Sequence, residues 1–160
     1  MAEYWTGFGA AEKDFWLGLD SLASLTRDAK FEMKTTLIDF AGKEYLGIYH
    51  NFSVGDGPRY TLNIGEYDVD LSNFGQDVFS VHNQMSFSTK DVDQDRNSGG
   101  SCSNKYGNGG WWYEDCSQIN INGENAGDKT FDWKLMRARV GEGGQSVMFK
   151  ETEIRIRKVI

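Results

Sequence analysis

The chain has 160 residues, of which 39% are hydrophobic and 14% aromatic, and it carries 19 glycines, one proline and a formal net charge of -7. This length and apolar content suffice for one domain with a packed core, and the glycines predict many turns and irregular loops. The acidic balance argues against nucleic-acid binding, which requires clustered Lys and Arg. No apolar run is long enough to cross a bilayer, and the start of the chain lacks the basic and then apolar layout of a signal peptide.

The first predicted element is a short helix within residues 15–26. Leu22 and Leu25 stand at helical spacing. Asp20 precedes them as the expected N-cap, because its carboxylate can accept a hydrogen bond from a main-chain N–H of the first turn. We therefore expect a short helix here, with Asp20 as its N-cap.

Three strands are predicted next. Residues 30–40 and 43–54 alternate apolar and polar side chains, with Phe31 and Met33 on one face of the first strand. The segment 41–43 contains a glycine and provides the turn of an antiparallel pair. A third strand is expected from Tyr60, after the Gly-Asp-Gly-Pro turn at 55–58.

Between residues 68 and 125 the alternation gives way to polar, glycine-rich and aromatic segments. Within a compact domain such a stretch is typical of functional loops. Alternation returns in residues 146–160, where Ile154 and Ile156 are separated by a charged residue, and this pattern predicts a closing strand.

An aspartate triplet lies within the irregular region. Asp91, Asp93 and Asp95 alternate and precede a Gly/Ser run. Calcium takes six to eight oxygen ligands, so the triplet indicates either a calcium loop or a solvated acidic turn. An EF-hand is excluded, because its sixth and twelfth positions require Gly and Glu and here hold Arg96 and Cys102.

Two cysteines, Cys102 and Cys116, follow the triplet. A disulfide between them would stabilise the domain by about 3 kcal/mol in the chain-entropy model. Two unrelated buried thiols are the alternative, and their spacing does not match a zinc site. The chain has two histidines, His50 and His82, and neither lies in a motif with a nucleophile. We therefore expect no enzyme activity.

Several motifs together carry a family resemblance. They are YWTGFG at 4–9, FWLGLDSLASLT at 15–26, HNQMSFSTKDVDQD at 82–95, GGWWYEDC ending at Cys116, and ININGEN at 119–125. In this order they resemble the fibrinogen C-terminal domain, which is found in ficolins, tachylectins, tenascins, angiopoietins and fibrinogen chains. The resemblance implies an α+β fold, mainly antiparallel sheet with short helices and a loop-rich calcium-binding region.

The resemblance also implies a metal site and a disulfide. Asp93 and Asp95 would bind Ca²⁺ through their side chains, Asn97 and Gly99 through their main-chain carbonyls, and Cys102 would pair with Cys116. Asp91 would lie outside the ligand set. The family usually has one residue fewer between the last Asp and the Cys, so the carbonyl ligands can shift by one position.

The lectin members of the family carry a ligand pocket beside the calcium, which accepts the acetyl group of N-acetylated sugars. By this resemblance, Tyr106 would form a wall, and a cis peptide between Asp115 and Cys116 would present main-chain N–H groups. Trp111 and Trp112 would instead pack beneath the loop, and His82 would be structural.

The chain departs from the lectin pattern at several pocket positions. Ser117 replaces a common His, Gly127 and Asp128 replace a Tyr-Ala pair, and Arg139 replaces an aromatic. Fibrinogen chains that bind a peptide amino terminus carry Asp and Arg at the positions of Asp128 and Arg139. A surface ion pair between these two side chains is the alternative interpretation.

The resemblance thus predicts one domain over residues 1–160, shorter at its N-terminus than family members usually are. We expect a secreted, extracellular, calcium-dependent lectin domain that binds N-acetylated glycans on microbial surfaces in innate immunity. The alternative is a module that recognises a peptide amino terminus or a receptor surface. The parent protein is expected to be oligomeric, because avidity multiplies weak sugar sites.

Overall fold

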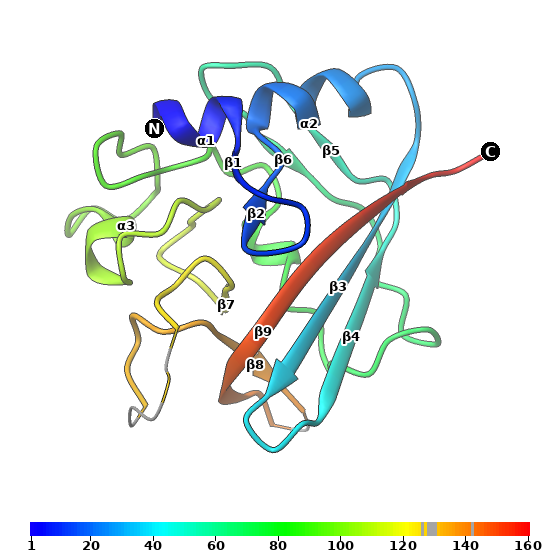
Figure 1. Ribbon diagram of the computed structural model, residues 1–160, viewed down its shortest axis with the longest axis vertical. Coiled ribbons are helices and arrows are strands. Elements are labelled where there is room, and N and C mark those ends of the chain that lie inside the picture. The colour runs from blue at the N-terminus through cyan, green and yellow to red at the C-terminus, as the bar shows by residue number, and fades with distance from the viewer. Residues whose placement is uncertain (126, 128–130, 142) are drawn as a thin grey trace.

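The structure is a computed structural model that describes residues 1–125, 127, 131–141 and 143–160. Figure 1 shows two parts side by side, an antiparallel sheet and a region of long loops around α3, with α1 and α2 above them. The fold is α+β and mainly antiparallel, as predicted.

The main sheet has five strands in the order β4-β3-β9-β8-β7, and every pair in it is antiparallel. The C-terminal strand therefore lies in the middle of the sheet rather than at its edge. The bounds are β3 Phe31–Asp39, β4 Glu44–Tyr49, β7 Ile119–Asn120, β8 Arg137–Val140 and β9 Gln145–Lys158.

Alternation explains why β3 forms an interior strand of the sheet, between β4 and β9. Phe31, Met33, Thr35 and Leu37 are buried, and the side chains between them are more exposed. The pairing register places Met33 opposite Tyr49 on one side and Ile156 on the other. The strand predicted at 30–40 and the closing strand are confirmed as β3 and β9, whereas the strand predicted at 43–54 ends at Tyr49 as β4, and residues 53–54 pair in a separate ribbon.

The remaining elements are short. Two two-stranded ribbons pair β1 with β2 and β5 with β6. Their bounds and those of the helices are α1 Ala2–Thr6, β1 Phe8–Gly9, β2 Phe15–Trp16, α2 Leu19–Thr26, β5 Ser53–Val54, β6 Leu62–Asn63, the 3-10 helix η1 Ser80–His82 and α3 Cys102–Lys105. Among the described residues, no helix has the length and apolar character to cross a membrane.

Two local predictions are wrong. The N-cap of α2 is Gly18 at φ 99, a left-handed conformation that glycine adopts without steric cost, so the helix begins before Asp20. The Asp20 carboxylate instead accepts a hydrogen bond of 2.6 Å from the Tyr60 hydroxyl. The strand expected from Tyr60 shrinks to β6, because Tyr60 itself has φ 46 and the N–H of Ile64 donates to the Asn83 side chain rather than to a ladder.

The core continues from the sheet into the loop region. Trp111, Trp112 and Tyr113 are buried, and edge contacts join Trp111 to His82 and Trp112 to Phe87. The predictions that both tryptophans pack beneath the loops and that His82 is structural are confirmed. The irregular backbone of this region therefore surrounds a rigid aromatic centre.

Candidate functional site

The segment 88–101, which carries the aspartate triplet and is called the aspartate loop below, is anchored to the aromatic core at its base. Ser88 and Trp111 exchange two main-chain hydrogen bonds, of 2.9 and 3.0 Å. The Ser88 hydroxyl accepts a further bond of 2.8 Å from the N–H of Gln94. The loop therefore enters and curls at a fixed point beside Trp111.

Side chains of the loop organise its own backbone. One oxygen of Asp95 accepts from the N–H of Asn97 at 2.9 Å, and the other accepts from the N–H of Cys102 at 2.7 Å. The Asp93 carboxylate accepts from the N–H of Asp95 at 3.2 Å. Burial raises the pKa of Asp95, and the neighbouring Asp93 carboxylate acts in the same direction. Two carboxylates thus lie close together without a cationic partner among the described residues.

The oxygens near this pair fit a hard cation. The carbonyls of Asn97 and Gly99 accept no hydrogen bond from any described residue. Within the described ranges, no three His, Cys, Asp or Glu side chains cluster to hold a metal. Calcium accepts carbonyl and water oxygens beside carboxylates, so two aspartates and two free carbonyls match its chemistry.

Asp91 stands apart from this pair. Its two oxygens accept hydrogen bonds of 2.7 and 2.8 Å from the amino group of Met1, and the Thr89 hydroxyl donates a third at 2.7 Å. The amino group and then the hydroxyl lower the pKa of Asp91 to about 2. Its position outside the pair is the one expected from the sequence.

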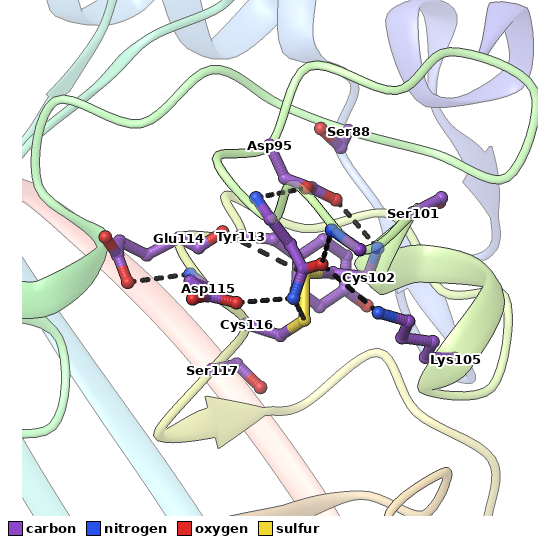
Figure 2. Close-up of a disulfide and its surroundings, with 12 residues drawn as sticks. Ser88, Asp95, Ser101, Cys102, Lys105, Tyr113, Glu114, Asp115, Cys116 and Ser117 are labelled. Atoms are coloured by element: carbon purple, nitrogen blue, oxygen red, sulfur yellow. Dashed lines mark hydrogen bonds between the residues drawn. A yellow bond between two sulfur atoms is a disulfide. The ribbon is translucent and has the colours of Figure 1, made fainter.

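A disulfide closes the other side of the site. Cys102, at the start of α3, bonds to Cys116, with their Cα atoms 5.5 Å apart. The Ser101 hydroxyl caps this short helix by accepting from the N–H of Asn104. Figure 2 shows the disulfide between Asp95 and Asp115, with Lys105 approaching from α3. The predicted pairing is confirmed, and it joins the aspartate loop to the segment around Cys116.

Asn97 forms a second, non-covalent link between the same two segments, and the sequence did not point to it. Its Nδ2 donates to the Asp115 carboxylate and lies 3.5 Å from the Cys116 sulfur. Its Oδ1 accepts from the N–H of Gly99 at 2.7 Å and from the Lys105 ammonium at 3.2 Å. One side chain therefore spans the predicted metal site and the predicted ligand pocket.

A pocket with a cavity volume of about 300 Å³ opens next to the disulfide. Five of the six residues predicted to bind ligand line it, and the sixth, Asp128, lies outside the described residues. The lining residues are Val81, Tyr106, Glu114, Asp115, Cys116, Ser117, Gln118, Trp133, Arg137 and Arg139. The Asp115–Cys116 peptide bond in its wall is cis, as expected from the resemblance.

Trp133 and Arg137 are pocket residues that the sequence did not reveal. The Arg137 guanidinium lies 4.6 Å from the Trp133 ring centre and 5.6 Å from that of Tyr106. It is 1% exposed, and its Nη2 donates to the Ser117 carbonyl at 3.3 Å. Arg137 and Arg139 point to the same face of β8 because they are two residues apart. The two-residue spacing of Arg137 and Arg139 could have indicated a strand with both side chains on one face, but the polar character of the segment is typical of a loop.

Among the described residues of the wall, two carboxylates already accept hydrogen bonds, whereas two main-chain N–H groups have no acceptor. Glu114 accepts from the N–H of Asp115 at 2.7 Å, and Asp115 accepts from Asn97. The N–H groups of Cys116 and Ser117 donate to no described residue. A ligand that offers acceptor oxygens would find partners here.

Comparison with known proteins agrees with this arrangement. The family model described as "Fibrinogen beta and gamma chains, C-terminal globular domain" matches residues 1–159. Fibrinogen-like protein A of Apostichopus parvimensis is 34% identical over 98% of the chain, and Tenascin-R of Gallus gallus is 35% identical over 83%. The chain spans 54% of the length of the first relative and 10% of the second.

Solved structures share the fold. The fibrinogen-like globe domain of human ANGPTL6 superposes with a TM-score of 0.85 at 30% identity, covering 99% of this chain and 70% of that one. Lamprey fibrin D-dimer, complexed with the peptide ligand Gly-His-Arg-Pro-amide, has a TM-score of 0.70 at 21% identity, covering 98% of this chain and 55% of that one. The chain belongs to the fibrinogen C-terminal globular domain family, whose domain is a non-catalytic binding module.

Proposed function

We propose that this domain is the calcium-stabilised recognition module of a secreted fibrinogen-related protein, and that its pocket binds N-acetylated glycans on microbial surfaces in innate immunity. The observation that carries the proposal is the wall formed beside the Tyr106 ring by the N–H groups of Cys116 and Ser117, which donate to no described residue. An acetyl group presents one acceptor oxygen and one methyl, which suit main-chain donors and an aromatic face respectively.

Calcium would be held by the side chains of Asp93 and Asp95 and by the carbonyls of Asn97 and Gly99. When bound, it would neutralise the two carboxylates and bring loop oxygens together. Asn97 would then bind calcium through its main-chain carbonyl while its side-chain amide donates to the Asp115 carboxylate. The loop's order would in this way be transmitted to the wall of the pocket.

The charges lining the pocket favour an acceptor-bearing ligand over an ammonium. Arg137 and Arg139 would repel a cation, while Asp115 already accepts from Asn97 and Glu114 from the N–H of Asp115. A peptide amino terminus or a receptor surface remains the second candidate, because Glu114 and Asp115 line the same pocket and could turn toward an amine. The lamprey fibrin relative has a peptide ligand.

The disulfide supports an extracellular location, because such bonds persist mainly in oxidising compartments. A single sugar site of this size would bind weakly. We propose that the parent protein is oligomeric and gains avidity from several copies of the domain.

The test of glycan binding is retention of the protein on an N-acetylated resin. We expect retention in calcium, loss of it in EDTA, and elution by free N-acetylglucosamine. Asp95→Asn should lose calcium-dependent retention, whereas Asp28→Asn, an exposed change of the same kind after α2, should keep it. Folded, calcium-loaded protein that passes through the resin would contradict the glycan assignment and direct attention to peptide partners.

Calcium binding itself is tested by thermal unfolding of the parent and of Asp93→Ala. A ligand at about 100 times its dissociation constant stabilises the native state by about 2.7 kcal/mol. For a domain of this size we expect calcium to raise the Tm of the parent by about 5–10 °C and that of the variant much less. Equal Tm values for the parent with and without calcium would refute the metal site.

A further inference from the structure

The turn between β4 and β5 carries a motif that lies outside both the aspartate loop and the pocket. Residues 51–53 read Asn-Phe-Ser, the one Asn-X-Ser/Thr triplet in the whole sequence. This triplet is the acceptor motif for N-linked glycosylation, a modification that requires a surface position in a secreted protein. A triplet this short also arises by chance, so the fold must show whether Asn51 is placed to carry a glycan.

Asn51 lies on the surface, in the bend between the end of β4 at Tyr49 and the start of β5 at Ser53. Its φ of 53 is a left-handed conformation, which Asn adopts more readily than most residues do. The side chain is exposed and makes no hydrogen bond with any described residue. The amide nitrogen that would carry a sugar is therefore not used by the described residues to hold the turn.

The two neighbours of Asn51 in the chain hold it in this position. On one side Phe52 is 3% exposed, and its N–H donates to the Phe31 carbonyl at 2.8 Å. On the other side the His50 carbonyl accepts from the N–H of Gly65 at 2.8 Å. Because both flanking residues are fixed, the exposed position of Asn51 is set by the fold.

The surroundings of the Asn51 amide leave room for a sugar. A Cβ added to Gly65 would lie 3.2 Å from the Asn51 Nδ2, so any side chain at residue 65 would crowd this nitrogen. The Ser53 hydroxyl makes no hydrogen bond with a described residue, whereas the acceptor motif requires a hydroxyl at this position. The motif therefore accounts for Ser53 better than the described contacts do.

We propose that Asn51 is a site of N-linked glycosylation. Its Nδ2 forms a bond to the anomeric carbon of an oligosaccharide, while the bond from that carbon to a lipid-diphosphate carrier breaks. The diphosphate leaves with the bonding electrons and one proton leaves Nδ2, so the transfer needs no oxidant or reductant. The inference rests on the proposed extracellular location and not on what the pocket binds.

A glycan on Asn51 leaves the pocket open. Figure 1 shows the connection from β4 to β5 on the side of the domain away from α3. Helix α3 begins at Cys102, whose disulfide leads to Cys116 in the wall of the pocket. The modification and ligand recognition therefore occupy different sides of the domain.

The experiment expresses the whole chain behind an added signal peptide in cultured animal cells. The mass of the protein from the medium and from the cells is measured before and after an amidase removes N-linked glycans. We expect the mass to fall by one glycan. The amidase converts the carrying Asn to Asp, so digestion in heavy-oxygen water should label residue 51 alone. An unchanged mass, or a label at another Asn, would overturn the assignment.

Variants separate the acceptor amide from the hydroxyl of the motif. Asn51→Gln removes the amide and Ser53→Ala removes the hydroxyl, and each should lose the glycan completely, whereas Ser53→Thr should keep it. Asn104→Gln is the matched control, because Asn104 is exposed and is followed by Lys and Tyr, which do not complete the motif. It should carry the glycan as the parent does. Full glycosylation of Asn51→Gln or of Ser53→Ala would contradict the proposal.

A binding measurement keeps this inference apart from the proposed function. Retention on the N-acetylated resin in calcium should be equal before and after deglycosylation. Protein that carries the glycan on Asn51 but is not retained in either form would overturn the glycan recognition alone, because the mass measurement does not involve the pocket. Retention gained only after deglycosylation would contradict the position of the glycan away from the pocket.

Discussion

The sheet and the loop region achieve the same degree of burial by different means. In the sheet, β3 pairs with β4 and β9 along its length, and Met33 and Leu37 are fully covered. The loop region contains one two-residue strand, η1 and α3 between residues 80 and 125, yet it buries Trp111 and Tyr113 completely. Regular pairing is therefore not what orders the loops.

Side chains replace the ladder in the loop region. The N–H of Gln94 donates to Ser88, that of Cys102 to Asp95, and Trp112 Nε1 donates to the Tyr60 carbonyl at 2.6 Å. A hydrogen bond to a side chain is lost when that residue is replaced, whereas a main-chain bond between two strands persists after most substitutions. The loops are therefore specified residue by residue, and covalent or ionic links there should matter more than in the sheet.

Truncating a core side chain of the sheet should lower stability more than any other change considered below. Leu37→Ala removes a side chain that is 0% exposed, and such truncations cost about 2–5 kcal/mol of unfolding free energy. Urea unfolding should show this loss equally with and without calcium, because the cavity lies away from the aspartate loop. Lys34→Ala, at an exposed position of β3, is the control and should change little. A calcium-dependent loss in Leu37→Ala would erase the distinction between the two parts.

Removing the disulfide tests the loop region. Replacing Cys102 and Cys116 together by Ala should cost about 3 kcal/mol in the chain-entropy model and weaken ligand binding, because the bond joins the aspartate loop to the pocket wall. Unfolding and sugar affinity are measured on the same protein. A double variant that loses stability but keeps the parent's affinity would show that the disulfide does not organise the pocket.

Acid should weaken the loop region through His82. This ring is buried and its Nδ1 donates to the Trp112 carbonyl at 2.8 Å, while desolvation lowers its pKa to about 4. The unfolded chain has the ordinary pKa of about 6.5 and binds the proton first. The stability contributed by neutral His82 is therefore fully present above about pH 6.5. It is lost as the pH falls toward the folded pKa of about 4, at up to about 1.4 kcal/mol per pH unit.

Urea unfolding of calcium-free protein between pH 7 and 4.5 measures this slope. His82→Gln should flatten it, because the substituted side chain does not titrate. His50→Gln is the matched control, since it removes the histidine of the sheet region, which contacts Glu32 and Asp68, and leaves His82 in place. Equal slopes in the parent and in His82→Gln would exclude His82 as the source.

Periodicity predicted the sheet because the physics there is repetitive. Alternation in β3 and in the end of β9 reports which face is buried, whatever the particular residues. It could not predict β8, where Arg137 occupies a buried position that a charged residue rarely takes. Nor could it place the N-cap of α2, which depends on the left-handed backbone of Gly18.

The site was predicted by motif rather than by pattern. The family resemblance located the disulfide and brought Tyr106, Ser117 and Arg139 to one pocket. Trp133 and Arg137 were missed because a motif marks only positions that match the family, and the Arg137 guanidinium meets the Tyr106 ring, distant in sequence, only in the folded chain. Contacts between residues that lie apart in sequence require the fold.

The weakest change is expected from a substitution that tests whether the aspartate loop and the pocket are linked by a side chain. Asn97→Ala removes the amide that donates to Asp115 but keeps the main-chain carbonyl predicted to bind calcium. Calcium should therefore still stabilise the variant, while losing one hydrogen bond should reduce sugar affinity by about fivefold, or about 1 kcal/mol. Calorimetry with N-acetylglucosamine, with and without calcium, checks both effects. Asn104→Ala, on the exposed face of α3, should match the parent. If calcium raises the affinity of Asn97→Ala as much as that of the parent, the loop reaches the pocket through the disulfide alone.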